Sequence, residues 1–218
     1  MSEALLAPTF LFRFAAPCHY RQKVGSKGGI ELDEADVLPS FGELEGKPLF
    51  ADLRAAWSEE GLVFVLQVAG KKQLPWCRAT RIEDSDGLQV WIDTRNAHNI
   101  HRASRFCHRF AFLPAGEGRK LDEPVAVLLA INRAKESPKE IARNALQVKA
   151  VRHHDGYALQ AFIPAAAMTG FDPSEHPRLG FSYAVIDREL GWQTFSIGPE
   201  FPFTEDPSLW GSLELVGR

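Results

Sequence analysis

The sequence predicts an all-β protein: an antiparallel, two-sheet β-sandwich of the jelly-roll kind with one or two short helices. Three observations lead to this prediction. Short runs with an apolar residue at every second position recur along the 218 residues, as half-buried strands require. Turn-forming residues separate these runs at regular intervals. Neither an internal repeat nor a linker interrupts the pattern, so we expect residues 1–218 to form a single domain.

The first half of the chain opens with a loosely alternating run, residues 10–14, which predicts a first strand. A strand fits this apolar start better than a signal peptide, because a basic leading segment is missing and Arg13 interrupts the run. Residues 25–29 are glycine-rich and predict a loop. Residues 50–57 and 62–69 flank the sequence SEEG and predict a hairpin. Its second strand is apolar on both faces, so we expect it in the centre of a sheet.

The second half supplies the remaining strands and both short helices. The sequence Ser137-Pro138-Lys139-Glu140 combines a capping box with proline at the first helical position, which predicts a helix to about Asn144. A second helix of one or two turns is predicted over residues 164–170, opened by proline and closed by glycine. The remaining predicted strands are residues 87–95, 106–113, 125–131, 146–152, 157–163, 178–187 and 211–216.

The strand over residues 87–95 carries the most informative pattern. Its apolar face consists of Leu88, Val90, Ile92 and Thr94, and its polar face consists of Gln89, Trp91, Asp93 and Arg95. A row of amide, indole, carboxylate and guanidinium groups suits a polar ligand that also has a flat apolar side, such as a sugar ring. The alternative is a sheet face covered by a loop, in which Asp93 and Arg95 pair with each other or with neighbours.

Histidines near this strand raise the question of a metal site. His98 and His101 lie in the loop between two predicted strands, and His108 lies on the second of them. Together with Asp93 they offer ordinary metal ligands. Their spacing matches no specific metal-binding motif. We therefore predict no metal site.

Composition excludes several classes of function. The net charge is −3 and no basic block occurs, so we expect no nucleic-acid partner. No apolar run approaches the ~20 residues that cross a bilayer, so we expect no membrane partner. Three scattered cysteines, Cys18, Cys77 and Cys107, favour reduced thiols and a cytoplasmic location. No cofactor is predicted, and the oligomeric state is left open.

The order of the sequence motifs resembles the family 9 carbohydrate-binding modules and the wider DOMON-like sandwiches. The resemblance covers roughly residues 50–215, and it implies a β-sandwich. Its motifs are the hairpin strand GLVFVLQV at residues 61–68, DGLQVWID at 86–93, GYALQAFIP at 156–164, LGFSYAVID at 179–187 and WGSLEL at 210–215. Each motif is weak alone, whereas several in the right order are moderately specific for the fold.

In sugar-binding members of that family, two aromatic rings clamp a terminal sugar, surrounded by carboxylates, amides and an arginine. The resemblance implies that Trp76 is the loop tryptophan and that Arg109 is the arginine of the next strand. Two departures weaken the match. Gln89 and Gln160 stand where the family has glutamates, and residues 164–167 contain no aromatic side chain where the second ring is expected. Trp192 or Trp210, from the C-terminal loop, are the candidates to replace that ring.

The sequence therefore predicts a non-catalytic domain that binds a carbohydrate by tryptophan stacking and a polar strand face. One alternative is a hydrolase that uses Asp86, Asp93 or a histidine, and a second is a purely structural or interaction sandwich. Haem binding, known for some DOMON-like domains, is disfavoured because Met1 and Met168 are the only methionines. No catalytic residue is assigned. The predicted ligand-binding residues are Trp76, Gln89, Trp91, Asp93, Arg109 and Trp192.

Overall fold

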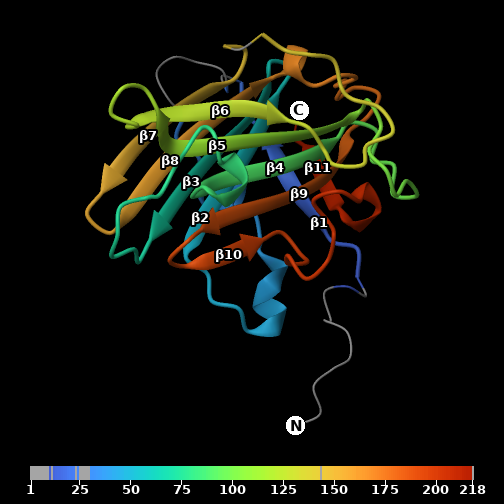
Figure 1. Cartoon of the computed structure of the whole chain (residues 1–218). Coiled ribbons are helices and arrows are strands. Elements are labelled where there is room, and N and C mark those ends of the chain that lie inside the picture. The colour runs from blue at the N-terminus through green and yellow to red at the C-terminus, as the bar shows by residue number, and fades with distance from the viewer. Residues whose placement is uncertain (1–9, 11, 23, 25–29, 143, 218) are drawn as a thin grey trace.

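The computed structural model describes residues 10, 12–22, 24, 30–142 and 144–217. Within these residues the fold is all-β, and the only helical elements are short 3-10 turns (Figure 1). The predicted fold class is thus confirmed as all-β. The predicted glycine-rich loop at residues 25–29 lies outside the described residues.

Eleven strands make up the described fold. They are β1 (Ala15–Tyr20), β2 (Ala51–Ser58), β3 (Gly61–Ala69), β4 (Gly87–Asp93), β5 (Cys107–Glu117), β6 (Glu123–Leu129), β7 (Gln147–His153), β8 (Gly156–Pro164), β9 (Arg178–Asp187), β10 (Gly191–Thr194) and β11 (Gly211–Val216). The 3-10 turns are η2 (Glu34–Asp36), η3 (Phe41–Glu45), η4 (Ile82–Asp84), η5 (Ala165–Ala167) and η6 (Pro207–Leu209).

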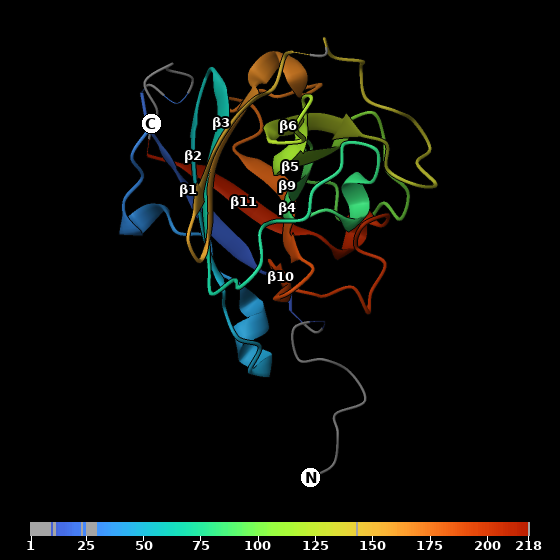
Figure 2. The ribbon, with the colours of Figure 1, turned by 60° about the vertical axis from the view of Figure 1, so that its left-hand side comes forward.

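The strands form one mixed sheet that curls nearly into a barrel, rather than two separate antiparallel sheets. Its strand order is β6-β5-β4-β9-β11-β1-β2-β3-β8-β7, and β10 pairs with β9. Figure 2 shows the two layers, with β11 and β1 running between them. The prediction of two sheets is corrected at β1. This strand pairs in parallel with β11 over residues 15–19 and with β2 at His19 and Tyr20, so hydrogen bonding continues from one layer to the other.

The predicted elements differ from the structure in four further places. The first strand begins at Ala15 rather than at residue 10. No helix forms in the described part of residues 137–144, where Lys139 N donates to Thr169 Oγ1 at 3.2 Å instead. A capping box supplies only local hydrogen bonds, and packing decides whether a helix follows. The second predicted helix shortens to η5, and the short strand β10 was missed.

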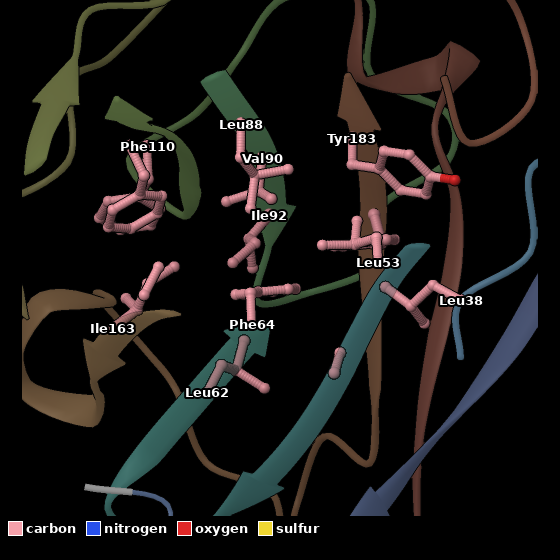
Figure 3. Close-up of a cluster of buried hydrophobic side chains, with 14 of the residues drawn as sticks. Leu38, Leu53, Leu62, Phe64, Leu88, Val90, Ile92, Phe110, Ile163 and Tyr183 are labelled. Atoms are coloured by element: carbon pink, nitrogen blue, oxygen red, sulfur yellow. The ribbon is translucent and has the colours of Figure 1, made fainter. Parts of the chain in front are cut away.

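The hydrophobic core fills the space between the two layers. Figure 3 shows Leu62 and Phe64 of β3 and Ile163 of β8 directed toward β4 and β5. The apolar face predicted for β4 is confirmed, because Leu88, Val90 and Ile92 are fully buried in this core. Burial of each such side chain contributes about 1.5 to 3 kcal/mol. Since this face is buried, the opposite face of β4 points out of the core.

Two sequence-based expectations concern the whole chain. Cys18, Cys77 and Cys107 are buried and unpaired, as predicted. Burial raises the pKa of Cys77 and of Cys107 to about 12, so both thiols stay protonated at neutral pH. In the described part of the chain, no helix has the length and apolar character needed to cross a membrane.

Candidate functional site

The outer face of β4 and its neighbours carries five of the six predicted ligand-binding residues. Gln89, Trp91 and Asp93 alternate with the core residues of β4, and Arg109 of β5 lies directly opposite Trp91. Trp192 of β10 belongs to the same face, because it pairs with Ile186 of β9, which in turn pairs with Gly87. The sixth residue, Trp76, lies in the loop that leads into β4.

Arg109 connects the strand face to the loop before β4. Its Nε and Nη2 donate to Gln89 Oε1 at 3.1 and 2.8 Å, and its Nη1 donates to Glu83 Oε1 at 2.9 Å. Gln89 and Arg109 are both buried, whereas 66% of the Glu83 side chain is exposed. The arginine thus holds a surface carboxylate in a fixed place. Glu83 was not predicted as a site residue, although it begins the acidic run EDSD just before the strand.

Trp91 and Asp93 serve the structure at the other end of the same face. Trp91 is fully buried, its ring lies 5.2 Å from that of Phe203, and its Nε1 donates to the carbonyl oxygen of Thr204 at 3.2 Å. Asp93 accepts hydrogen bonds from the backbone N–H groups of Arg95 and Ala97 at 3.0 and 2.7 Å. Here the alternative of a sheet face covered by a loop describes the arrangement.

Trp76 is half-buried and surrounded by guanidinium groups. The Cζ atom of Arg188 lies 4.3 Å from the centre of the indole ring. Arg78 and Arg81 lie 5.4 and 5.6 Å from the same centre. These distances are within the ~6 Å over which a cation is attracted to an aromatic ring. The ring is therefore a partly accessible platform with positive charge around it.

A buried cluster of ions fixes the backbone at Trp76 and at Arg188. Lys71 Nζ donates to Asp86 Oδ2 at 3.0 Å and also to Asp187 Oδ2, and all three side chains are buried. Asp86 also accepts from the backbone N–H of Trp76 at 3.1 Å and from that of Arg188 at 2.9 Å. Burial raises the pKa of Asp86, against the opposing effect of these hydrogen bonds. Asp86 and Asp93, the carboxylates considered for a hydrolase, are thus both bound to backbone N–H groups.

A hollow of about 470 Å³ adjoins the pair formed by Glu83 and Arg109. This volume is within the range of ligand pockets, roughly 300 to 1,000 Å³. The hollow lies between the loop of residues 79–84 and the end of β6, and Glu83, Arg81 and Asn132 contribute polar side chains to it. Since Arg81 also approaches Trp76, the hollow and the indole ring are neighbours.

The histidines considered as metal ligands turn to separate partners. His108 is buried on the inner side of β5, where its Nε2 accepts from the backbone N–H of Thr169 at 2.9 Å. His101 contacts Asp206 and Ser208, and His98 contacts Ser212. Over the described residues, no group of three histidine, cysteine or acidic side chains is arranged to hold a metal ion.

Solved structures similar to this fold include carbohydrate-binding modules. A family 9 module from Caldicellulosiruptor kristjanssonii, solved with cellotriose, matches with a TM-score of 0.61 at 14% identity, over 94% of this chain and 95% of that one. The chain has the fold of a family 9 carbohydrate-binding module. The same module solved with glucose matches equally well, over 94% of this chain and 97% of that one.

A third structure extends the similarity. It is described as a putative carbohydrate-binding protein from Bacteroides uniformis, and it matches with a TM-score of 0.55 at 14% identity, over 93% of this chain and 98% of that one. No protein-family model and no curated protein matches the sequence. The resemblance inferred from the order of the motifs is therefore confirmed for the fold. At this identity the comparison carries the fold and no ligand.

Proposed function

We propose that this protein binds a carbohydrate without catalysing a reaction, at the end of the outer sheet face that carries Trp76, Glu83 and Arg109. The observation that carries the proposal is the linked set Gln89–Arg109–Glu83, which holds an exposed carboxylate in the lining of a hollow whose Arg81 also approaches the indole ring of Trp76. The fold supports it, because family 9 modules with the same fold have been solved with glucose and with cellotriose.

The chemistry of this end suits a sugar. Glu83 uses Oε1 for its hydrogen bond to Arg109, so Oε2 is available to accept from a sugar hydroxyl. A carboxylate that is already bound to a guanidinium costs less entropy to order around a ligand. The half-buried indole of Trp76 offers apolar surface to the C–H side of a sugar ring. The hydrogen bond to Glu83 would orient the sugar, and stacking on Trp76 would add to its affinity.

Trp192 is the second aromatic ring in this proposal. It is 38% exposed and shares the outer face with Gln89. Because β9 separates β10 from β4, the Cα atom of Trp192 lies about 10 Å from that of Gly87, which follows the loop of Trp76. In this proposal Trp91 and Asp93 keep their structural contacts and do not touch the sugar. The buried free thiols support a reducing, cytoplasmic compartment for this function.

The test is a titration of the purified protein with glucose and cellotriose, followed by calorimetry and by tryptophan fluorescence. We expect binding that Trp76→Ala and Glu83→Gln each weaken by about tenfold or more. Leu74→Ala is the matched control, since Leu74 is 73% exposed in the same loop and should leave binding unchanged. The proposal fails if no sugar of a broad neutral and acidic panel binds, or if Trp76→Ala binds as well as the unaltered protein.

A further inference from the structure

The charge around Trp76 is not balanced by nearby carboxylates. Arg81 forms a salt bridge with Asp84, but the structure records no ion pair for Arg78 or Arg188 within its described residues. The side chains of Arg78 and Arg188 are exposed. Two guanidinium groups thus lie beside one indole ring with no anion to neutralise them.

The acidic side chains around this cluster are occupied elsewhere. Glu83 binds Arg109, and Glu189 accepts from the backbone N–H groups of Lys72 and Gln73 at 2.9 and 3.0 Å. Glu189 also lies 3.9 Å from Lys71 Nζ. Asp86 is buried below the ring and faces Lys71. Arg78 Nη1 donates to the carbonyl oxygen of Cys77 at 2.8 Å, but over the described residues neither Arg78 nor Arg188 has a carboxylate partner. Their positive charges therefore remain available to a ligand.

The backbone position of Arg188 is fixed by the fold. Its backbone N–H and that of Trp76 donate to the two oxygens of the same buried carboxylate, Asp86. That carboxylate is itself held by Lys71. The backbone at Arg188 and the backbone at Trp76 are consequently held by one carboxylate, which keeps the bases of the two side chains close together before a ligand arrives.

A neutral sugar and an anionic sugar meet this arrangement differently. A neutral ring that stacks on Trp76 has to compete with the Arg188 guanidinium 4.3 Å from the ring centre. An anionic group makes charge-assisted hydrogen bonds to the guanidinium where it already lies, and these are about twice as strong as neutral hydrogen bonds. The arrangement thus favours a ligand that brings negative charge to the ring.

We propose that the carbohydrate bound at this site is anionic, with a carboxylate or sulfate group held by Arg188 and Arg78 beside Trp76. This inference rests on the proposed function and narrows its ligand to acidic sugars, such as uronic acids or sulfated hexoses. Arginine is suited to this role because its planar fork of N–H groups matches both oxyanions in a bidentate manner.

The test compares three small probes on the same protein by calorimetry: glucose, glucuronate and glucose 6-sulfate. We expect at least one of the two anionic sugars to bind about tenfold more tightly than glucose. Its advantage should shrink several-fold between about 0.05 M and about 0.5 M NaCl, because salt screens the exposed guanidinium groups. Comparing glucuronate with glucose 6-sulfate distinguishes a carboxylate from a sulfate ligand.

Two variants assign the preference to this site. Arg188→Gln should remove the advantage of the anionic sugar and should not weaken glucose binding, because a neutral ring then no longer competes with the guanidinium for the face of Trp76. Arg105→Gln is the matched control, because Arg105 is also an exposed arginine over an aromatic ring, that of Phe106 at 5.0 Å, and should change neither affinity. Circular dichroism of each variant verifies that the fold is retained.

The outcomes separate this inference from the function on which it rests. If glucose binds as tightly as both anionic sugars, or if Arg188→Gln keeps the anionic preference, the inference is wrong and carbohydrate binding stands. If none of the three probes and no sugar of the wider panel binds, the proposed function is wrong and the inference fails with it.

Discussion

The two ends of the outer face of β4 differ in what covers them. At one end Trp91 is fully buried beneath Phe203 and Thr204 of the C-terminal loop. Toward the other end Gln89 accepts from the guanidinium of Arg109, which reaches from above the Trp91 ring to the exposed Glu83, and the half-buried Trp76 lies in the loop before the strand. Both ends come from one alternating strand. The alternation decides that these side chains leave the core, and the covering loops decide which of them meet solvent.

The same contrast separates two kinds of cover. The C-terminal loop seals its end with apolar contacts, which add Phe203 and Trp210 to a second buried cluster around Trp91. The loop before β4, which contains Trp76, is held in place by the ion pairs of Lys71 with Asp86 and Asp187. Other charged side chains of this loop remain at the surface. The apolar contacts of the C-terminal loop stabilise the fold, whereas the buried ions hold a loop that presents polar groups at the surface. The following predictions test this division.

The largest effect is expected at the sealed end. Trp91→Ala should lower the free energy of unfolding by about 4 kcal/mol, because it removes a fully buried indole and leaves a cavity. Urea denaturation measures the change. Trp91→Phe is the conservative control and should cost clearly less. The comparison breaks down if Trp91→Ala is as stable as the unaltered protein or abolishes sugar binding without loss of stability.

The second-largest loss of stability is expected when the buried ion cluster is disrupted. Lys71→Met leaves Asp86 and Asp187 buried without their cation, which should cost about 3 kcal/mol at pH 7. The pKa of Asp86 is already raised by burial, so the folded protein takes up a proton there at a higher pH than the unfolded chain does. Binding of this proton to Asp86 therefore stabilises the folded state, and this contribution grows as the pH falls toward the pKa of Asp86 in the unfolded chain.

The difference between Lys71→Met and the unaltered protein should therefore be largest at neutral pH and should narrow in acid. Thermal unfolding at a series of pH values measures it. A gap that is constant with pH, or that widens in acid, would show that the carboxylates do not depend on this lysine. The exposed neighbour Lys72 offers the matched control, since Lys72→Met leaves the cluster intact.

The pKa of His108 reports how completely water is excluded from the inner side of β5. Burial lowers its pKa to about 4, whereas the unfolded value is about 6.5. The unfolded chain thus binds a proton more readily, and stability falls as the pH decreases from about 6.5 to about 4. The full loss from this residue, below both pKa values, is about 3 to 4 kcal/mol.

A variant isolates this contribution. His108→Gln keeps an acceptor near the N–H of Thr169 but cannot titrate, so it should flatten the dependence of unfolding free energy on pH in that interval. Denaturant titrations at pH 7, 5.5 and 4.5, which lie in and above this window, measure the slope. An unchanged slope in the variant would assign the acid sensitivity to other groups.

The smallest effect on stability is expected at the open end. Trp192 is 38% exposed on the strand β10, so Trp192→Ala should change the free energy of unfolding by less than about 1 kcal/mol. Its measurable effect should be on carbohydrate affinity instead. A large loss of stability with no change in affinity would place Trp192 with the sealed end and leave Trp76 as the only aromatic platform.

Much of the fold could be predicted because it depends on local patterns. The strands at residues 178–187 and 211–216 coincide with β9 and β11, and the alternation over residues 87–93 gave the correct inner and outer faces. The parallel strand β1 was displaced from its predicted place, since its partners β2 and β11 are distant in the sequence. The helix signal at residues 137–140 failed because local capping cannot supply the packing that a helix needs.

The candidate site divides in the same way. The sequence by itself determined that Gln89, Trp91 and Asp93 share a face, because side-chain alternation is a property of the strand alone. Only the tertiary structure decided that Trp91 is covered, that Glu83 reaches Arg109, and that Arg188 lies beside Trp76. Those contacts join residues 26 to 113 positions apart. Which side chains a loop covers, and which charged groups pair across such long stretches of sequence, depend on how the loops cross the sheet. No local sequence pattern encodes that path.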